Sequence, residues 1–239
     1  MPIKLVIFDF DGTLFDTHRS ISHCIKLTFD ALLPAQAPSE AEVHRLISSG
    51  AGLQDTFKAL HPSATTDASH DDSFDEERWT ATYRSLYAEH GQPLITPFPG
   101  AAELLAALRA RGIPAAIVSN KGVAAVVTAL RNNGLGECVR EELIVGDKTP
   151  GATRKPDPGS YTDVLLPALG WAEASDDGSS VLVVGDTEAD IRFAANIGAA
   201  AVSVWCRYGY GDKAACEKLG PGFTVNSLGE IEGIVNRLS

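Results

Sequence analysis

The sequence predicts an α/β protein, a doubly wound parallel sheet that carries a small all-helical domain inserted after the first strand. Short apolar runs, mostly rich in β-branched residues, alternate with helical patterns that are long enough to connect parallel strands. The alternation breaks once, because no convincing strand occurs from about residue 17 to residue 96. We therefore expect residues 1–16 and 97–239 to form the α/β core and residues 17–96 to form the helical domain.

Five continuous apolar runs are the expected strands. Such runs are typical of strands that are buried on both faces, as the strands of a parallel sheet are. The runs are Ile3–Phe8, Ile113–Val118, Leu143–Val145, Val181–Val184 and Ala201–Val204.

Periodic apolar patterns between these runs predict the helices of the core. The patterns lie at Ala101–Ala110, Val123–Asn132, Ser160–Leu169 and Glu188–Asn196. A glycine follows each pattern, at the point where a helix commonly ends in a left-handed residue. These glycines are Gly112, Gly134, Gly170 and Gly198.

The inserted domain has four helical patterns of its own, at His18–Leu32, Ser39–Ile47, Leu53–Leu60 and Phe74–Glu89. Residues 61–73 are rich in Ser, Thr, Asp and Ala, and we expect them to form a mobile loop. An aromatic stripe follows that loop with a spacing of four residues, which favours packing in the core of this domain. The stripe consists of Trp79, Tyr83 and Tyr87.

The charge, hydropathy and cysteine content of the sequence limit the kinds of partner and the environment that we expect. The 20 Lys and Arg residues and 31 Asp and Glu residues give a formal net charge of −11, whereas nucleic-acid-binding surfaces are basic, so we expect no nucleic-acid partner. The first apolar run is far shorter than the about 20 residues that cross a bilayer, so we expect no membrane span. The four cysteines include no CxxC pair. We expect them to be free thiols in a reducing cytoplasm.

Chemically active side chains follow the expected strands. In an open parallel sheet, ligands bind beyond the carboxyl ends of the strands. The first run is followed by Asp9-Phe10-Asp11-Gly12-Thr13, the second by Ser119-Asn120-Lys121, and the fourth by Gly185-Asp186-Thr187-Glu188-Ala189-Asp190. The third run leads through a loop to Lys155-Pro156-Asp157-Pro158.

Four carboxylates are expected to converge at this edge of the sheet. Asp9 and Asp11 are two residues apart, so along an extended chain their side chains point the same way, and Gly12 then allows an abrupt turn. Asp186 adds a third acid, and Asp190 lies four residues later, at the start of a helix. Four acids without a cluster of His or Cys indicate a hard, oxygen-ligated ion such as Mg²⁺ rather than zinc.

Positive and hydrogen-bonding groups at the same edge indicate a phosphate site. Ser119 and Asn120 offer hydrogen-bond donors, and Lys155 supplies a compact positive charge. A carboxylate is a competent nucleophile toward phosphorus, because an aspartyl-phosphate intermediate divides one hard displacement into two easier ones. Asp11 is placed to protonate the leaving oxygen and later to deprotonate water.

The four segments, in this order, resemble the four motifs of the haloacid dehalogenase-like hydrolase superfamily. The resemblance spans the whole chain in architecture, and it implies a Rossmann-like core with a helical cap. It also implies that Asp9 is the nucleophile and Asp11 the general acid/base. Ser119 and Lys155 would bind phosphate, with Asn120 beside them.

The resemblance further implies how a magnesium ion is held. The acids of the fourth motif bind the metal in this superfamily, which implies a direct role for Asp186 and a less direct one for Asp190. A carboxylate oxygen of Asp9 and the main-chain carbonyl of Asp11 usually complete the site. Gly12 and Thr13 belong to the first motif and are expected to support these residues.

The insertion between the first two motifs resembles the cap of the subclass that contains phosphoglycolate phosphatase and β-phosphoglucomutase. The segment Tyr208-Gly209-Tyr210-Gly211 also weakly resembles the phosphoglycolate phosphatase group. We therefore expect a cytoplasmic, Mg²⁺-dependent phosphatase of a small phosphorylated metabolite, with 2-phosphoglycolate the first substrate to try. The protein would be a monomer or a homodimer.

Two other functions remain as alternatives. A phosphosugar mutase shares every motif named above, so the sequence separates it poorly from a phosphatase. A non-hydrolytic phospho-acceptor signalling module is less favoured, because receiver domains are near half this length and have no insertion after the first strand. The role of Lys121 is also open, since it either belongs to the phosphate site or simply opens a helix.

Overall fold

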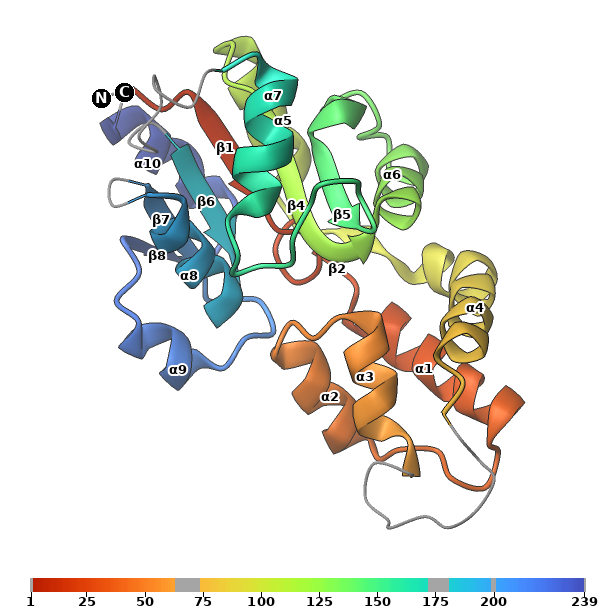
Figure 1. Ribbon diagram of the computed structural model, residues 1–239. Helices are drawn as coiled ribbons and strands as arrows, with labels where there is room; N and C mark the ends of the chain where they lie inside the picture. The colour runs from red at the N-terminus through yellow and green to blue at the C-terminus, as the bar shows by residue number, and fades with distance from the viewer. Residues whose placement is uncertain (1, 63–73, 172–180, 199–200, 239) are drawn as a thin grey trace. The chain divides into compact units, whose positions relative to one another are not determined.

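The structure is a computed structural model that describes residues 2–62, 74–171, 181–198 and 201–238 (Figure 1). The chain divides into two compact units, one formed by Met1–Asp16 with Thr96–Ser239 and the other by Thr17–Ile95. The expected loop at residues 61–73 lies almost entirely outside the described residues.

The first unit contains a six-stranded sheet in which all neighbouring strands run parallel, in the order β5-β4-β1-β6-β7-β8. This arrangement, with helices packed against the sheet (Figure 1), confirms the predicted fold class. The strands are β1 Leu5–Phe8, β4 Ala115–Gly122, β5 Ile144–Asp147, β6 Val181–Gly185, β7 Val202–Cys206 and β8 Phe223–Val225. The first five strands in this list each begin inside one of the five expected runs.

The sheet is built outward from β1, which is buried along its whole length. The chain first adds β4 and β5 on one side of β1 and then adds β6, β7 and β8 on the other. The order of the strands therefore reverses at β1. In a doubly wound sheet this reversal opens a crevice at the carboxyl end of the central strands, where ligands bind.

The helices of this unit are α5 Ala101–Ala110, α6 Val123–Asn132, α7 Leu166–Leu169, α8 Glu188–Ile197, α9 Lys213–Lys218 and α10 Gly229–Leu238. Helices α5 and α6 have the predicted bounds. The single helix expected at Ser160–Leu169 is instead a π-helical turn, Ser160–Leu165, followed by α7. Pro167 lies in α7, and because proline has no N–H the regular hydrogen-bond series cannot run through it.

The sequence patterns did not predict the last three elements of this unit, and they gave the wrong conformation for the glycine after α8. Strand β8 and helices α9 and α10 were not predicted, because three to ten residues with mixed polarity give little periodic signal. The expectation for Gly198 is wrong: its φ of 169° is extended backbone, whereas Gly112, Gly134 and Gly170 have the left-handed conformation.

A small antiparallel pair of strands connects the sheet unit to the rest of the chain. Strand β2, Phe15–Asp16, pairs with β3, Thr96–Pro97, so that Asp16 lies opposite Thr96. Thr96 therefore belongs to the first unit. The chain leaves this unit and returns to it through neighbouring residues.

The second unit is helical in its described residues. Its α-helices are α1 His18–Leu32, α2 Glu40–Ser48, α3 Leu53–Leu60 and α4 Glu76–Leu86, and a π-helical turn, Tyr87–Gly91, follows α4. The predicted aromatic stripe lies in the core of this unit, where Trp79 packs edge-on against Phe29 at 4.7 Å between ring centroids and Tyr83 against Phe57 at 5.6 Å. Substrate contact is not needed to explain these aromatic side chains.

No helix among the described residues is long and apolar enough to cross a membrane. The four cysteines are free thiols, as predicted.

Candidate active site at the carboxyl end of the sheet

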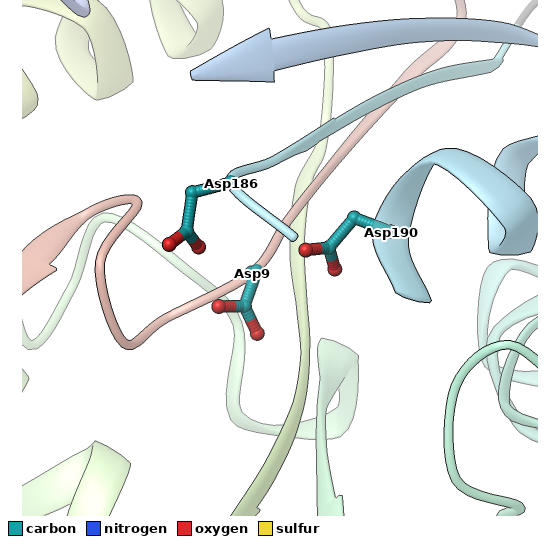
Figure 2. Close-up of side chains that lie close together, drawn as sticks. All are labelled: Asp9, Asp186 and Asp190. Carbon is teal, nitrogen blue, oxygen red and sulfur yellow. The ribbon is translucent and has the colours of Figure 1, made fainter. Parts of the chain in front are cut away.

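The acidic side chains of the first and fourth motifs are brought together by adjacent parallel strands. In the register of β1 with β6, Phe8 lies opposite Val184, so the residues that follow these strands emerge side by side. Carboxylate oxygens of Asp9, Asp186 and Asp190 all lie within 4.8 Å of one another, and all three residues are buried. Figure 2 shows the three side chains lying close together at the ends of their elements.

Burial of these acids disfavours their charged forms. Burial raises the pKa of Asp9 from 3.8 to about 7, and the neighbouring charges of Asp190 and Asp11 act in the same direction, while Lys155 opposes them. The pKa of Asp186 is also raised well above its ordinary value, again chiefly by burial. A cation bound among these carboxylates would offset the repulsion between them.

Lys155 supplies one positive charge to this group. Its ammonium nitrogen Nζ donates to Oδ1 of Asp9 at 2.5 Å and to Oδ1 of Asp190 at 2.6 Å. Burial alone would lower the pKa of Lys155, but the two carboxylates outweigh that effect and raise it above its ordinary value. An ammonium group has three N–H donors, so a third hydrogen bond, for example to a phosphate oxygen, is possible beside these two.

Asp186 has no such charged partner. Its two carboxylate oxygens accept hydrogen bonds from neutral donors, Oδ1 from the Thr13 hydroxyl at 3.0 Å and Oδ2 from the Tyr210 amide at 2.7 Å. Within the described parts of the chain, Asp186 forms no salt bridge. A buried carboxylate without a cationic partner is expensive, so this site fits a bound cation.

Both carboxylate oxygens of Asp190 already accept hydrogen bonds from other residues. Its Oδ2 accepts hydrogen bonds from both the amide and the hydroxyl of Thr187, at 3.0 and 2.7 Å, and its Oδ1 accepts from Lys155. Gly185 makes this arrangement possible, since a Cβ at that position would lie 2.1 Å from Cγ of Asp190. Asp190 therefore positions Lys155 directly, and the donor set that remains for a cation is made of oxygens of Asp9 and Asp186. Oxygen donors of this kind fit Mg²⁺.

Asp11 lies outside the group of three acids and forms its own ion pair. Nζ of Lys121 lies 3.0 Å from Oδ1 and 3.3 Å from Oδ2 of Asp11. The question left open for Lys121 is thus answered in part, because its side chain contacts a predicted catalytic residue. The acidic group does not test the predicted metal contact of Asp11, which involves its main-chain carbonyl.

The turn after Asp11 is shaped by its contact with Asp186. Gly12 has a left-handed φ of 81°, and a Cβ there would lie 2.5 Å from Oδ2 of Asp186. Thr13, the next residue, donates its hydroxyl to Oδ1 of the same carboxylate. Gly12 and Thr13 thus both lie against the Asp186 carboxylate, and their supporting role in catalysis stays a prediction.

Ser119 and Asn120 lie within strand β4, which continues to Gly122 rather than ending at Val118. The pairing of β4 with β5 is irregular between Val118 and Gly122, so these residues depart from the regular ladder. Ser119 is buried, and its Oγ accepts a hydrogen bond from the Lys121 amide at 3.2 Å. The predicted site residues thus form two connected sets, one around Asp9, Lys155 and Asp186 and one around Asp11, Lys121 and Ser119.

The end of β7 and the segment after it contribute contacts that the sequence patterns did not predict. Tyr210 donates its amide to Asp186, and Trp205 donates its indole N–H to the main-chain oxygen of Asp186 at 3.1 Å. The sequence signal of this segment is the pair of glycines at positions 209 and 211, which by itself indicates only a weak resemblance to the phosphoglycolate phosphatase group.

Comparison with known proteins identifies the class. The family model of haloacid dehalogenase-like hydrolases matches residues 3–198, so the chain belongs to this family, and the predicted resemblance is confirmed. Membership in the family also confirms that the chain is a hydrolytic enzyme.

Several individual relatives of the chain carry the name of one kind of phosphatase. The chain is 35% identical over 214 residues to a phosphoglycolate phosphatase of Rhodospirillum rubrum, covering 88% of this chain and 81% of the relative. It is 31% identical to a phosphoglycolate phosphatase of Thiobacillus denitrificans over 99% of this chain and 97% of the relative. A crystal structure of a predicted phosphoglycolate phosphatase from Haemophilus somnus superposes with a TM-score of 0.79 at 25% identity, with 97% of each chain covered. These names agree with the predicted phosphatase class.

Proposed function

We propose that the protein is a Mg²⁺-dependent phosphatase that hydrolyses a small phosphomonoester through an aspartyl phosphate on Asp9, with 2-phosphoglycolate as the first candidate substrate. The observation that carries the proposal is the buried Asp9 carboxylate, held by Lys155 beside an Asp186 that has no charged partner among the described residues. The curated relatives named phosphoglycolate phosphatase support the choice of substrate.

Asp9 is the proposed nucleophile because of how its two oxygens are used. Lys155 holds Oδ1, and no described residue donates a hydrogen bond to Oδ2. The carboxylate is thus fixed in orientation while one oxygen keeps its lone pairs for attack on phosphorus. Attack forms the aspartyl phosphate and releases the alcohol of the substrate.

Lys155 and Ser119 are the proposed phosphate ligands of the chain. The Lys155 ammonium, bound to Oδ1 of the same carboxylate, would neutralise charge on the phosphoryl group as it transfers to Oδ2. The Ser119 hydroxyl and the Asn120 amide would donate hydrogen bonds to the same phosphoryl group from the neighbouring strand β4.

Asp11 is the proposed general acid and base. In the first step it would donate a proton to the leaving alkoxide oxygen, and in the second it would take a proton from the water that hydrolyses the aspartyl phosphate. Its ion pair with Lys121 holds Asp11 in place as a carboxylate, so the proton that Asp11 gives to the leaving oxygen would first be taken up from solvent.

Oxygens of Asp9 and Asp186 would hold the divalent cation. Asp190 would position Lys155 through the hydrogen bond that its Oδ1 accepts from the ammonium group. A bound Mg²⁺ supplies charge neutralisation for the transferring phosphoryl group. The helical unit Thr17–Ile95 is the proposed cap that selects the substrate.

The test is phosphate release from a panel of small phosphoesters, assayed with Mg²⁺ and with EDTA. We expect Mg²⁺-dependent release from 2-phosphoglycolate by the wild-type protein and none by Asp9→Asn. Mass spectrometry of acid-quenched protein should find one added phosphoryl group on the peptide that contains Asp9. Conversion between sugar 1- and 6-phosphates without net phosphate release would instead identify a mutase, and stable labelling without turnover would identify a phospho-acceptor module.

A further inference from the structure

The segment from Trp205 to Cys216, which leads from the end of β7 into α9, surrounds Asp186. The indole N–H of Trp205 and the thiol of Cys216 both donate to the main-chain oxygen of Asp186, at 3.1 and 3.7 Å. The amide of Tyr210 donates to its carboxylate oxygen Oδ2 at 2.7 Å. The backbone and the side chain of Asp186 are therefore both held by one short stretch of chain.

Two glycines bring this stretch close to Asp186. A Cβ at position 209 would lie 2.2 Å from Cβ of Asp186, and a Cβ at position 211 would lie 2.1 Å from its main-chain oxygen. Neither Gly209 nor Gly211 is among the glycines with positive φ. Glycine is therefore needed at these positions for the close approach of two chain segments rather than for an unusual backbone conformation.

The two tyrosines fix the same stretch to the loop after β1 and to strand β2. The Tyr208 hydroxyl donates to the main-chain oxygen of Thr13 at 2.8 Å, and the Tyr210 hydroxyl donates to Oδ1 of Asp16 at 2.6 Å. Thr13 in turn donates its own hydroxyl to Asp186. Burial raises the pKa of the Tyr208 hydroxyl, so this group remains a neutral donor.

We propose that residues 208–211 form a clasp that sets the orientation of the Asp186 carboxylate and thereby the affinity of the site for a divalent cation. The proposal rests on the proposed function in one respect, that Asp186 is a ligand of that cation. Tyr210 and Gly209 are positioning residues, since they act through Asp186.

The geometry of the hydrogen bonds explains how the clasp would act. One donor on each oxygen, Thr13 on Oδ1 and Tyr210 on Oδ2, fixes the plane of the carboxylate and so the directions of the lone pairs that remain. Both donors are neutral, so no cationic side chain among the described residues competes with a metal ion for the Asp186 carboxylate, whereas Asp9 and Asp190 are both paired with Lys155. Partners of this kind commonly alter metal affinity by about 10- to 100-fold when they are removed.

The test measures the binding of Mn²⁺ alone to the purified full chain, by isothermal titration calorimetry or by electron paramagnetic resonance. Gly209→Ala places a methyl group against Asp186, and we expect it to weaken Mn²⁺ binding by about 10-fold or more. Tyr210→Phe keeps the amide donor but removes the hydroxyl contact with Asp16, and a smaller, measurable loss of affinity is expected. Gly233→Ala is the matched control, because a Cβ there meets no atom within 4 Å.

Two further readouts separate positioning from a general loss of structure. Thermal unfolding in EDTA reports whether each variant is folded. Phosphatase activity of Gly209→Ala should recover as the Mg²⁺ concentration is raised, with an unchanged KM for p-nitrophenyl phosphate at saturating Mg²⁺. A merely destabilised protein would not be rescued in this way.

The outcomes distinguish the two proposals. Wild-type Mn²⁺ affinity in Tyr210→Phe overturns the clasp, and it does so even where Gly209→Ala fails to fold. If the wild-type protein itself binds no Mn²⁺ and releases no phosphate, the proposed function fails. If the wild-type protein does both and the variants bind Mn²⁺ equally well, only the clasp fails.

Discussion

Lys155 is the shared ion-pair partner of two buried carboxylates. Its ammonium group contacts both Asp9 and Asp190, and its side chain is 5% exposed. Removing one partner of a buried ion pair leaves the other charge without compensation, which costs more than the pair contributes when it is intact. Stability and catalysis are therefore expected to depend on the same side chain.

Lys155→Met is expected to lower the free energy of unfolding by about 3–5 kcal/mol near pH 8, because it leaves Asp9 and Asp190 charged and buried. It should also abolish measurable phosphatase activity, since the charge beside the nucleophile is lost. Chemical denaturation and phosphate release measure the two effects. The exposed Lys4→Met is the control, and a Lys155→Met protein as active as the wild type would contradict the assignment.

The raised pKa of Asp9 predicts a pH dependence of stability. A carboxyl group whose pKa is about 7 in the folded state and 3.8 in the unfolded state binds its proton more tightly when folded. The free energy of unfolding of the metal-free protein should therefore decrease as the pH rises from about 4 to about 7. Asp186 contributes with the same sign.

Denaturation in EDTA across this pH range measures the slope. Asp9→Asn removes the titrating group, so its slope should be shallower than that of the wild-type protein. Asp30→Asn, on an exposed face of α1, is the control and should keep the wild-type slope. A slope that is identical in Asp9→Asn and the wild-type protein would show that Asp9 is not the titrating group.

At the scale of an element, the start of α8 links helix stability to the site. Thr187 and Asp190 form the capping box of this helix, and the same Asp190 carboxylate holds Lys155. Helix α2 has a capping box with the same spacing, formed by Ser39 and Glu42, but its residues are exposed and lie in the helical unit. The two helix starts thus offer a matched pair.

Thr187→Ala and Ser39→Ala should each lower the free energy of unfolding by about 1 kcal/mol, because each removes one side of a capping box. Only Thr187→Ala is expected to reduce kcat, since only its partner Asp190 orients Lys155. Denaturation curves and steady-state kinetics on both variants check this. Equal effects of the two substitutions on kcat would mean that the capping box of α8 has no separate role in the site.

At the scale of the whole molecule, the helical unit behaves as an insertion with adjacent ends. Asp16 and Thr96 are paired across β2 and β3, and the sheet unit has its own buried core. Segments whose ends lie close together can commonly be inserted or removed without loss of the surrounding fold. The acids, Lys155 and the residues of the clasp all belong to the sheet unit.

Replacing residues 17–95 with a short Gly/Ser linker should therefore leave a protein that unfolds cooperatively and still binds Mn²⁺. Its selection among phosphoester substrates should broaden, because the proposed cap is absent. Circular dichroism melting, Mn²⁺ titration and the phosphoester panel measure these properties. A deletion variant that melts without cooperativity would show that the sheet unit requires the helical unit to fold.

Local patterns in the sequence determined much of this protein. Buried parallel strands give continuous apolar runs, and helices α1, α3, α5 and α6 give periodic patterns with defined stops, so their bounds could be predicted closely. The motif residues could be assigned to one edge of the sheet because parallel strands place their carboxyl ends together. Asp9, Asp186 and Asp190 do lie together there.

Only the tertiary structure decided how those residues are paired. The sequence could not indicate that Lys155 lies between Asp9 and Asp190, that Lys121 lies against Asp11, or that the amide of Tyr210 holds Asp186. These contacts join residues that are between 24 and 146 positions apart in the chain. Hydrophobic periodicity reports which face of an element is buried, whereas hydrogen-bond partners are set by distances and angles that exist only after the strands have paired.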